Sequence, residues 1–381
     1  MVVATTSSTQ LDDLLDRISR KLQLSETEYA RVEQSYRAVT NWLRAKESPI
    51  AEFLPDIYPQ GSFRIRTTLK PRGRDEFDLD FVCELQVDPA RFPDPIVLLV
   101  MIEERLRASG HYKDKVTRKN RCIRISFDRF HLDILPACPK PSSGLYGEHA
   151  VVVPDCDADD WKPSNPKGYA KWFDVMAQEA VVRFMKSVEP LPEQQSCDEL
   201  STLSLGVQLI KRNRDIVFEK KPKRAPISIV LTTLAAQNYH GQPSVSEAIA
   251  AILDGIVAMI PNIANPRLMV LNPTNVEEDL SERWDSAPEA YLDFVSWIRD
   301  FRDQWKQLIE LRGVGIHKIS AVLERMFGER ITKEVVEEHI RAYEQPRQSG
   351  GLAVERGTGL IVPATIASST PIRPNTFYGE D

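Results

Sequence analysis

Two aspartates and a Gly-Ser pair lie close together in this sequence and could bind a metal ion and a phosphate. Asp78 and Asp80 are separated by one residue, within Phe-Asp-Leu-Asp-Phe-Val-Cys. If this segment is a strand, its side chains alternate between two faces, so both carboxylates point the same way, about 7 Å apart. Carboxylates placed in this way can share a divalent metal ion. Gly61-Ser62, further upstream, offers backbone N–H groups and a hydroxyl to a phosphate.

Asp133 is a third carboxylate, and it lies inside an apolar segment, residues 130–136, that has the pattern of a strand. Charged residues are rarely buried without partners. A structural salt bridge or a turn cap is the ordinary explanation for Asp133, and a solvated strand face is the ordinary one for Asp78 and Asp80. Three carboxylates on adjacent strands would instead suit two-metal nucleotidyl transfer, in which the protein mainly positions groups and stabilises charge.

A second basic segment could contact the same phosphates. Residues 211–224 contain seven Lys and Arg side chains, most of which a solvated helix face would explain. Lys211 differs because it ends an apolar stretch, so its stem could be buried and its amine directed inward. Ser228 lies in the first turn of a following helix, where it could donate to a phosphate or cap the helix.

Composition limits the classes of protein that fit. The chain has 381 residues, of which 42% are hydrophobic and 27% are charged, and these values favour a globular protein of two domains. The formal net charge of −6 argues against a surface that holds long duplex nucleic acid. Five cysteines without a Cys-x-x-Cys pair favour a reducing compartment. No apolar run has the roughly 20 residues that cross a bilayer, and no secretory signal is evident.

The expected elements place the three carboxylates in an N-terminal half that contains strands. Residues 10–24 have helical spacing, and Ser25 with Glu28 forms a capping-box pattern that restarts a helix, so a long N-terminal helix or a broken pair is predicted. Strands are predicted at residues 77–83, 121–127 and 130–136, with a helix over 95–109. From residue 163 helices predominate, and residues 345–381 are expected to have little regular structure.

These motifs resemble those of the nucleotidyltransferase superfamily that includes poly(A) polymerases and CCA-adding enzymes. The resemblance rests on Gly61-Ser62, on Asp78-x-Asp80, and on Asp133 in His-Leu-Asp-Ile-Leu-Pro-Ala. The chain resembles the bacterial CD-NTases more closely, which are relatives of cyclic GMP–AMP synthase and oligoadenylate synthase. This closer resemblance extends over residues 50–340 and rests on residues 164–173, on Leu-Ile-Lys-Arg ending at Arg212, on Pro226-Ile227-Ser228, and on Asn272-Pro273 through Trp284.

The resemblance implies an α+β fold with two lobes. A nucleotidyltransferase core with a mixed β-sheet and a long N-terminal spine helix would occupy residues 1–162. A helical lobe, residues 163–344, would close the active-site cleft, and residues 345–381 would form a C-terminal tail.

The resemblance also implies an activity and a site. The expected enzyme joins ATP and other nucleoside triphosphates into a cyclic di- or trinucleotide, releasing pyrophosphate, in bacterial anti-phage (CBASS) defence. It would use two Mg²⁺ ions, or Mn²⁺, bound by Asp78, Asp80 and Asp133, and Asp133 would also help to deprotonate the attacking hydroxyl. The residues that would hold the donor triphosphate are Gly61, Ser62, Lys211 and Ser228.

Expectations about partners follow from the same resemblance. The chain lacks the zinc-ribbon cysteines of cyclic GMP–AMP synthase, so we expect no requirement for long duplex DNA; we also expect a cytoplasmic monomer without membrane contact. The tail from Gln345 is either a terminus without fixed structure or a docking or covalent-attachment segment for an operon-encoded regulatory protein. Two alternatives stay open, namely an enzyme that adds nucleotides to an RNA end or a protein, and a catalytically silent nucleotide-binding protein.

Overall fold

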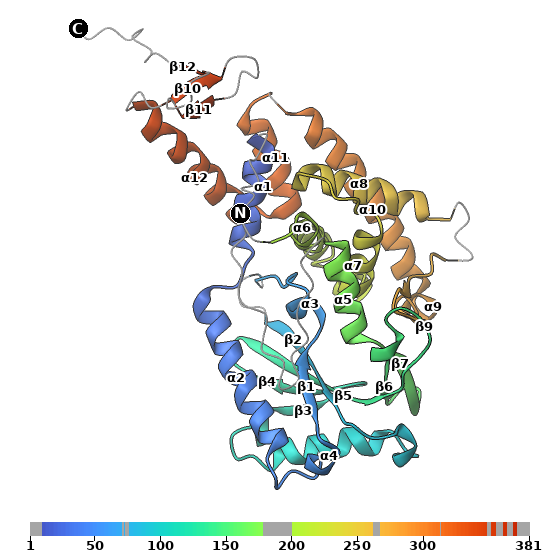
Figure 1. Ribbon diagram of the computed structural model, residues 1–381. Coiled ribbons are helices and arrows are strands. Elements are labelled where there is room, and N and C mark those ends of the chain that lie inside the picture. Colours follow the sequence, from blue (N-terminus) through green and yellow to red (C-terminus); the bar gives the residue numbers. More distant parts are fainter. Residues whose placement is uncertain are drawn as a thin grey trace, which may run out of the picture.

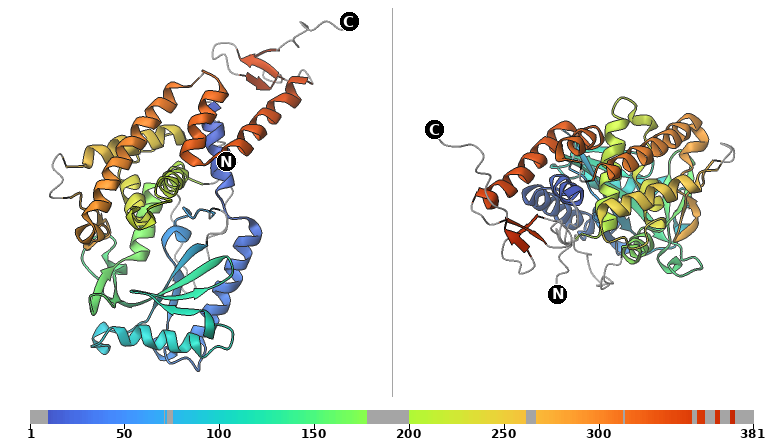
Figure 2. Two further views of the ribbon diagram at one scale, coloured as in Figure 1. Left: turned by 180° about the vertical axis from the view of Figure 1, so that it is seen from behind. Right: turned by 90° about the horizontal axis from the view of Figure 1, so that it is seen from above.

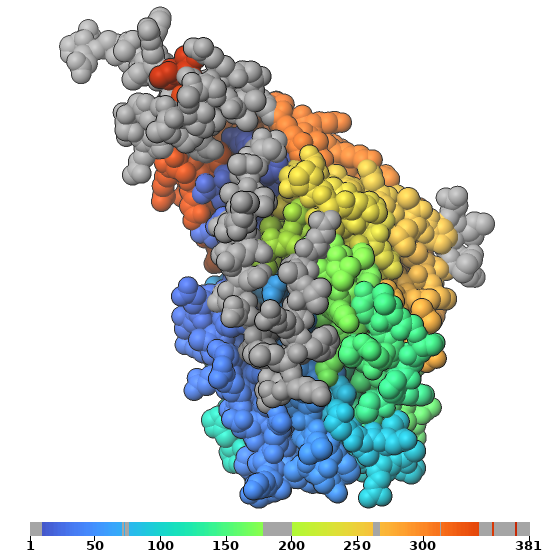
Figure 3. Space-filling model, viewed as in Figure 1, coloured from blue at the N-terminus to red at the C-terminus, as the bar shows by residue number. Residues whose placement is uncertain are grey.

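The computed structural model of the chain is an elongated molecule with two lobes (Figures 1, 2 and 3). One lobe, the sheet lobe, contains a mixed β-sheet, and the other, the helical lobe, consists mainly of helices. No helix in the described part of the chain is both long and apolar enough to span a membrane. The structure describes residues 10–70, 72, 76–177, 200–261, 267–312, 314–348, 352–355, 361–363 and 369–371.

The sheet lobe is built on seven strands. Five of them follow the order β1-β2-β5-β4-β3, while β6 pairs with β5 and β7 with β6. β2 and β5 are parallel neighbours, and the other pairs are antiparallel. This confirms the predicted mixed sheet and its three predicted strands. The seven are β1 (Asp56–Pro59), β2 (Phe77–Glu84), β3 (Val116–Arg118), β4 (Ile123–Ser126), β5 (Phe130–Pro139), β6 (Val151–Asp155) and β7 (Asp160–Ser164).

Alternation along the strands decides which side chains are buried. The apolar residues Phe77, Leu79 and Phe81 of β2 share one buried cluster with residues of α2 (Glu26–Arg44) and α4 (Ile96–Arg107). Successive side chains of a strand point to opposite faces, so the intervening residues of β2 lie on the other face of the sheet. β4 and β5 repeat the pattern, with Ile123, Ile125, Leu132 and Ile134 in the same cluster.

The N-terminal segment is a broken pair of helices, and its two halves are buried in different lobes. The Ser25 hydroxyl accepts from the backbone N–H of Glu28, and the Glu28 carboxylate accepts from that of Ser25, so the predicted capping box starts α2. The apolar side chains of α1 (Gln10–Lys21), however, pack in the cluster of the helical lobe. The predicted unit of residues 1–162 therefore includes a helix whose core contacts belong to the other lobe.

The helical lobe buries one large apolar cluster among its helices. Short 3₁₀ turns and a two-stranded ribbon connect the elements of both lobes. The turns are η1 (Ala51–Phe53), η2 (Pro89–Arg91), η3 (Lys113–Lys115), η4 (Gly147–His149) and η6 (Pro222–Arg224). The remaining elements of the two lobes are α3 (Gly61–Arg64), α5 (Pro166–Met176), α6 (Thr202–Val217), α7 (Ser228–Gln237), α8 (Val245–Met259), β8 (Leu271–Asn272), β9 (Asn275–Asp279), α9 (Arg283–Ser286), α10 (Pro288–Glu310), α11 (Ile316–Phe327) and α12 (Glu329–Gln348).

The C-terminal segment contains more regular structure than its composition predicted. α12 continues to Gln348, and three short strands follow it: β10 (Leu352–Glu355), β11 (Ile361–Pro363) and β12 (Ser369–Pro371). They form an antiparallel sheet in the order β11-β10-β12 at the end of the molecule away from the sheet lobe (Figure 1). Apolar residues between the Gly, Pro and Ser residues allow this pairing, which a count of turn-forming residues does not reveal.

Candidate active site

The carboxylates of the two parallel strands lie on the face of the sheet that α2 and α4 leave open. Asp80 of β2 is directly opposite Asp133 of β5 in the register of the pair, and Asp78 is opposite His131. The apolar neighbours of all three aspartates belong to the buried cluster on the other face. The predicted common face for Asp78 and Asp80 is therefore present, and the parallel pairing adds Asp133 to it.

Arg124 of β4 joins two of these carboxylates. In the antiparallel pairing of β4 with β5, Arg124 is opposite Asp133. Its guanidinium donates through Nε and Nη2 to the two oxygens of Asp133, both at 2.7 Å, and Nη2 also lies 2.9 Å from Oδ1 of Asp78. The hydrogen bond to Asp133 raises the pKa of the Arg124 guanidinium. Sequence reasoning missed this residue, although its position between Ile123 and Ile125 in a predicted strand placed a cation on the polar face.

Asp80 is the carboxylate with the most strongly altered pKa. Burial, together with the neighbouring charges of Asp133 and Asp78, raises its pKa to about 7. Burial also raises the pKa of Asp78, against the lowering effect of Arg124. Among the residues that the structure describes, none forms a hydrogen bond or ion pair with the Asp80 carboxylate. The oxygens of the Asp80 carboxylate are therefore available to bind a ligand or a metal ion.

Gly61 lies directly against Asp80, and Ser62 follows it in α3. The backbone N–H of Gln60 donates to the Asp80 carbonyl at 2.8 Å, which places the start of α3 beside β2. Gly61 has φ of +61°, and a Cβ at this position would lie 2.6 Å from Oδ2 of Asp80. A residue without a side chain is therefore required both by the backbone conformation and by the available space. The Ser62 hydroxyl is 3.2 Å from that of Thr68.

The helical lobe contributes Lys211 and Ser228 from α6 and α7. Lys211 is buried, as predicted, and its ammonium donates to the carbonyl of Thr67 at 2.7 Å. Burial and the nearby Arg214 lower the pKa of Lys211 to about 7. Ser228 begins α7 but does not cap it, and its hydroxyl accepts from Nη1 of Arg214 at 3.0 Å. Both residues belong to the wall of the cleft that faces the sheet lobe.

A cleft of about 870 Å³ lies between the lobes and collects most of the predicted site residues. Gly61, Ser62, Asp78 and Asp80 line it from the sheet lobe, and Lys211 and Ser228 line it from the helical lobe. Asp133 is not part of the lining and lies one strand further away. The volume of the cleft suits a nucleotide-sized ligand. Charged lining residues to which sequence reasoning gave no individual role include Glu76, Arg212, Arg214, Asp215, Glu219 and Arg283.

The basic residues between Ser62 and Asp78 divide between several roles. Lys70 and Arg72 line the cleft. Arg64 forms an ion pair with Asp174 of α5 at 3.2 Å, so it joins two elements of the protein and is not among the lining residues. Arg74 lies outside the described residues. Among the described residues of this segment, Lys70 and Arg72 are therefore the cations that line the cleft.

The donor set suits a hard divalent cation. In the described part of the chain no three His, Cys, Asp or Glu side chains are gathered closely enough to hold a metal ion. Two of the three aspartates contact Arg124 instead. The oxygens available are those of carboxylates, which are the ligands that Mg²⁺ and Mn²⁺ prefer. The free carboxylate of Asp80 beside Gly61 fits such an ion, provided that Asp78 and Asp133 turn toward it.

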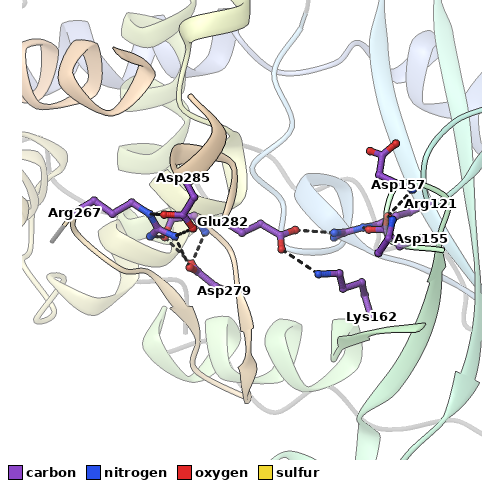
Figure 4. Close-up of polar contacts among 10 residues, drawn as sticks. Arg121, Asp155, Asp157, Lys162, Arg267, Asp279, Glu282 and Asp285 are labelled. Atoms are coloured by element: carbon purple, nitrogen blue, oxygen red, sulfur yellow. Dashed lines mark hydrogen bonds and ion pairs between the residues drawn. The ribbon is translucent and has the colours of Figure 1, made fainter. Parts of the chain in front are cut away.

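A network of ion pairs connects the lobes next to the cleft (Figure 4). Arg121, just before β4, donates to Asp155 at 2.5 Å and to Glu282 of the helical lobe at 2.7 Å. Lys162 of β7 lies 3.5 Å from the same Glu282 carboxylate. On the other side, Arg267 pairs with Asp279 and Asp285 and so closes the turn that carries Glu282. The next residue, Arg283, lines the cleft, so the ion pairs that hold Glu282 also fix the position of Arg283 at the cleft.

Comparison with known proteins yields relatives over the whole chain. The model of a family described as the Second Messenger Oligonucleotide or Dinucleotide Synthetase domain matches residues 8–176. A c-di-GMP synthase from Roseivirga ehrenbergii is 33% identical over 384 residues, covering 100% of both chains. The cyclic dinucleotide synthase CdnG from Bradyrhizobium diazoefficiens is 27% identical over 404 residues, covering 97% of this chain and 95% of that protein.

Solved structures share the fold at lower identity. The CD-NTase CdnG of Bradyrhizobium diazoefficiens in complex with GTP superposes with a TM-score of 0.69 at 24% identity, covering 87% of this chain and 99% of that one. CdnC of Escherichia coli MS115-1 with ATP gives a TM-score of 0.59 at 15% identity, covering 83% and 97%. These similarities establish the predicted two-lobed architecture.

Proposed function

The chain belongs to the bacterial CD-NTase family, nucleotidyltransferases that make cyclic oligonucleotides, and we propose that it joins two molecules of GTP into cyclic di-GMP. The choice of base and ring size rests on the relative from Roseivirga ehrenbergii, a c-di-GMP synthase that is 33% identical over the full length of both chains. The CdnG structure with bound GTP is consistent with the same substrate.

The observation that carries the catalytic proposal is the pairing of Asp80 with Asp133 on parallel strands beside Gly61. Asp78, Asp80 and Asp133 would hold a pair of Mg²⁺ ions, which would supply charge neutralisation at the reacting phosphate. A ribose hydroxyl of one nucleotide attacks the α-phosphorus of the other, and the bond from that phosphorus to the pyrophosphate oxygen breaks. Asp133 accepts the hydroxyl proton. In the second step, the remaining ribose hydroxyl of the linear dinucleotide attacks the α-phosphorus of its remaining triphosphate. This closes the ring and releases a second pyrophosphate.

The helical lobe would hold the triphosphate. Lys211 and the Arg214–Ser228 pair line the cleft opposite Gly61 and Ser62, so a donor triphosphate between the lobes would meet positive charge from one side and hydrogen-bond donors from both. This arrangement explains why a protein of net charge −6 contains a local site for a highly charged anion.

Lys211→Met is expected to weaken triphosphate binding and to remove the part of its pH dependence that comes from Lys211. With a pKa of about 7, the Lys211 amine is mostly neutral in the free enzyme at pH 8. A bound triphosphate favours the charged amine, so the wild-type affinity should rise roughly fivefold between pH 8 and pH 7, in proportion to the protonated fraction. Calorimetric titration with a non-hydrolysable GTP analogue in EDTA at both pH values measures this.

The matched control for that experiment is Lys306→Met, because Lys306 is exposed and pairs with Asp254 outside the cleft. It should behave as wild type. Protonation of the analogue itself affects all three proteins equally. If Lys211→Met retains both the affinity and the pH dependence of wild type, Lys211 is not a triphosphate ligand.

Product analysis tests the proposed reaction. The protein is incubated with all four nucleoside triphosphates, or with each alone, in Mg²⁺ or Mn²⁺, then treated with phosphatase and analysed by mass spectrometry and linkage-specific nuclease. GTP alone should yield a phosphatase-resistant product with the mass of cyclic di-GMP. Radiolabelled nucleotide that appears on added tRNA or protein would favour an enzyme that modifies an RNA end or a protein. Nucleotide binding without turnover would favour a catalytically silent protein.

We further propose the biological setting of the enzyme. The predicted CBASS role implies a cytoplasmic monomer whose product activates a separate effector. The division of the chain into residues 1–162, 163–344 and 345–381 is also part of this proposal. The segment after α12, with the small sheet of β10, β11 and β12, is the candidate docking site for an operon-encoded protein. Deletion of residues 360–381 should abolish co-purification of such a protein and leave cyclic di-GMP synthesis intact, whereas unchanged binding to every operon-encoded protein would refute the docking role.

A further inference from the structure

Arg124 occupies the position where a cation is needed among the site carboxylates. Its guanidinium reaches both Asp133, on the neighbouring strand, and Asp78, one strand further, with distances of 2.7 Å and 2.9 Å. A single Nη2 atom takes part in both contacts. The three aspartates together bring three potential negative charges, and Arg124 is the cation in direct contact with two of them.

The two contacts differ in strength. Asp133 accepts two hydrogen bonds in a bidentate pair, and its side chain is only 12% exposed. Asp78 accepts one longer contact, and its side chain is 55% exposed. Bidentate, shielded pairs between arginine and carboxylate are stronger than single contacts in solvent. The link to Asp78 is therefore the one that gives way when another cation competes.

We propose that Arg124 is a built-in counter-ion that holds the metal site closed until a divalent cation displaces it from Asp78. This inference rests on the proposed metal-binding role of the three aspartates. After displacement, the Nε hydrogen bond to Oδ1 of Asp133 is kept, which orients that carboxylate and leaves its Oδ2 for the metal, so Arg124 is a positioning residue. Metal binding then competes with an internal ion pair, which lowers the affinity of the free enzyme for metal.

The proposal explains two features of the site. The three aspartates do not converge on a common point in the described part of the chain, although they share one face of the sheet. Asp80, the aspartate that Arg124 does not contact, has no ion pair of its own among the described residues and lies against Gly61. A divalent cation bound first by Asp80 would need Asp78 to leave Arg124.

The test compares metal binding by wild type, Arg124→Met and Arg124→Lys in the absence of nucleotide. Binding of Mn²⁺ is measured from the electron paramagnetic resonance signal of the free ion. Arg124→Met should bind Mn²⁺ roughly two- to fivefold more tightly than wild type, the change expected from removing one exposed competing ion pair. Arg124→Lys keeps the charge without the bidentate pair and should fall between the two.

The rise in melting temperature on addition of Mg²⁺ supplies a second measurement, and a purely structural role would not alter it. Removal of Arg124 leaves Asp133 shielded and unpaired, so Arg124→Met should melt at a lower temperature in EDTA. Addition of Mg²⁺ should then raise its melting temperature by more than it raises that of wild type. If Arg124 were merely structural, the variant would be destabilised by the same amount with and without Mg²⁺.

Arg118→Met is the control, because Arg118 pairs with Glu103 at 2.5 Å and is not among the residues that line the cleft. It should leave Mn²⁺ affinity unchanged. Mn²⁺ binding by Arg124→Met that is equal to or weaker than that of wild type would overturn the proposal. The product assay is independent of this outcome, so failure of the counter-ion role and failure of the synthase assignment can be told apart.

Discussion

Asp80→Asn is expected to abolish cyclic dinucleotide synthesis and, at the same time, to stabilise the metal-free protein. The carboxylate of Asp80 is the free oxygen donor beside Gly61, and an amide removes its charge with little change in shape. Loss of a group that binds metal and stabilises the transition state should lower kcat by roughly a thousandfold or more. Mass spectrometry of the products measures the activity.

The stability gain follows from the direction of the pKa shift. Because the pKa of Asp80 is raised to about 7 in the folded protein from 3.8, folding disfavours the charged form. The folded wild type binds more protons than the unfolded chain between pH 4 and pH 7, so wild-type stability falls as the pH rises through this window. Asparagine cannot ionise, so the Asp80→Asn protein avoids the cost of a buried charge. The melting temperature of this variant in EDTA should therefore exceed that of wild type above pH 7, and the difference should vanish near pH 4.

Each kcal/mol of this gain should appear as roughly 2–4 °C in the melting temperature for a domain of 150–250 residues. Asp114→Asn serves as the control, since Asp114 is exposed and does not line the cleft; it should alter neither activity nor melting temperature. An Asp80→Asn protein that still converts GTP at a measurable rate would exclude Asp80 from the metal site. One that melts lower than wild type at pH 8 would show that Asp80 is charged and satisfied in the fold.

Gly61→Ala should cause the second largest loss of activity. The added Cβ would lie 2.6 Å from Oδ2 of Asp80, inside the contact distance of any real pair, and φ of +61° is costly for alanine by about 1–2 kcal/mol. Asp80 or α3 must therefore shift. A displacement of about 1 Å in a catalytic group can cost roughly a hundredfold in rate, and we expect kcat for cyclic di-GMP to fall by at least that amount.

Gly144→Ala separates backbone strain from the steric effect. Gly144 has φ of +113°, yet a Cβ there would meet no atom within 4 Å. This variant should lose stability without losing activity, whereas Gly61→Ala should lose both. Wild-type kcat in a folded Gly61→Ala protein would mean that the close approach of Gly61 to Asp80 is not needed for catalysis.

Much of the site could be predicted from local patterns. The alternation of apolar and acidic residues in residues 77–83 correctly placed Asp78 and Asp80 on one face, because the period of a strand is a local property. The apolar stretch before Lys211 likewise predicted a buried stem. The capping box at Ser25 marked the start of α2, since it depends only on residues three apart.

Other features depended on contacts between distant segments. Nothing local determined that α1 packs in the helical lobe while α2 packs on the sheet, since both helices carry similar apolar stripes. Arg124 became visible as a partner of Asp133 only when β4 was placed beside β5. The Gly, Pro and Ser content of the C-terminal segment concealed the short strands β10 to β12.

The sequence by itself determined the chemical kinds of group in this protein: three aspartates in strands, a Gly-Ser pair before them, and a lysine and a serine far downstream. Only the tertiary structure decided which of them meet. The parallel register of β2 and β5 put Asp80 opposite Asp133, and the close approach of α6 and α7 to the sheet lobe brought Lys211 and Ser228 to the same cleft. The physical reason is that strand periodicity is encoded over a few residues, whereas register and lobe packing minimise the free energy of the whole chain.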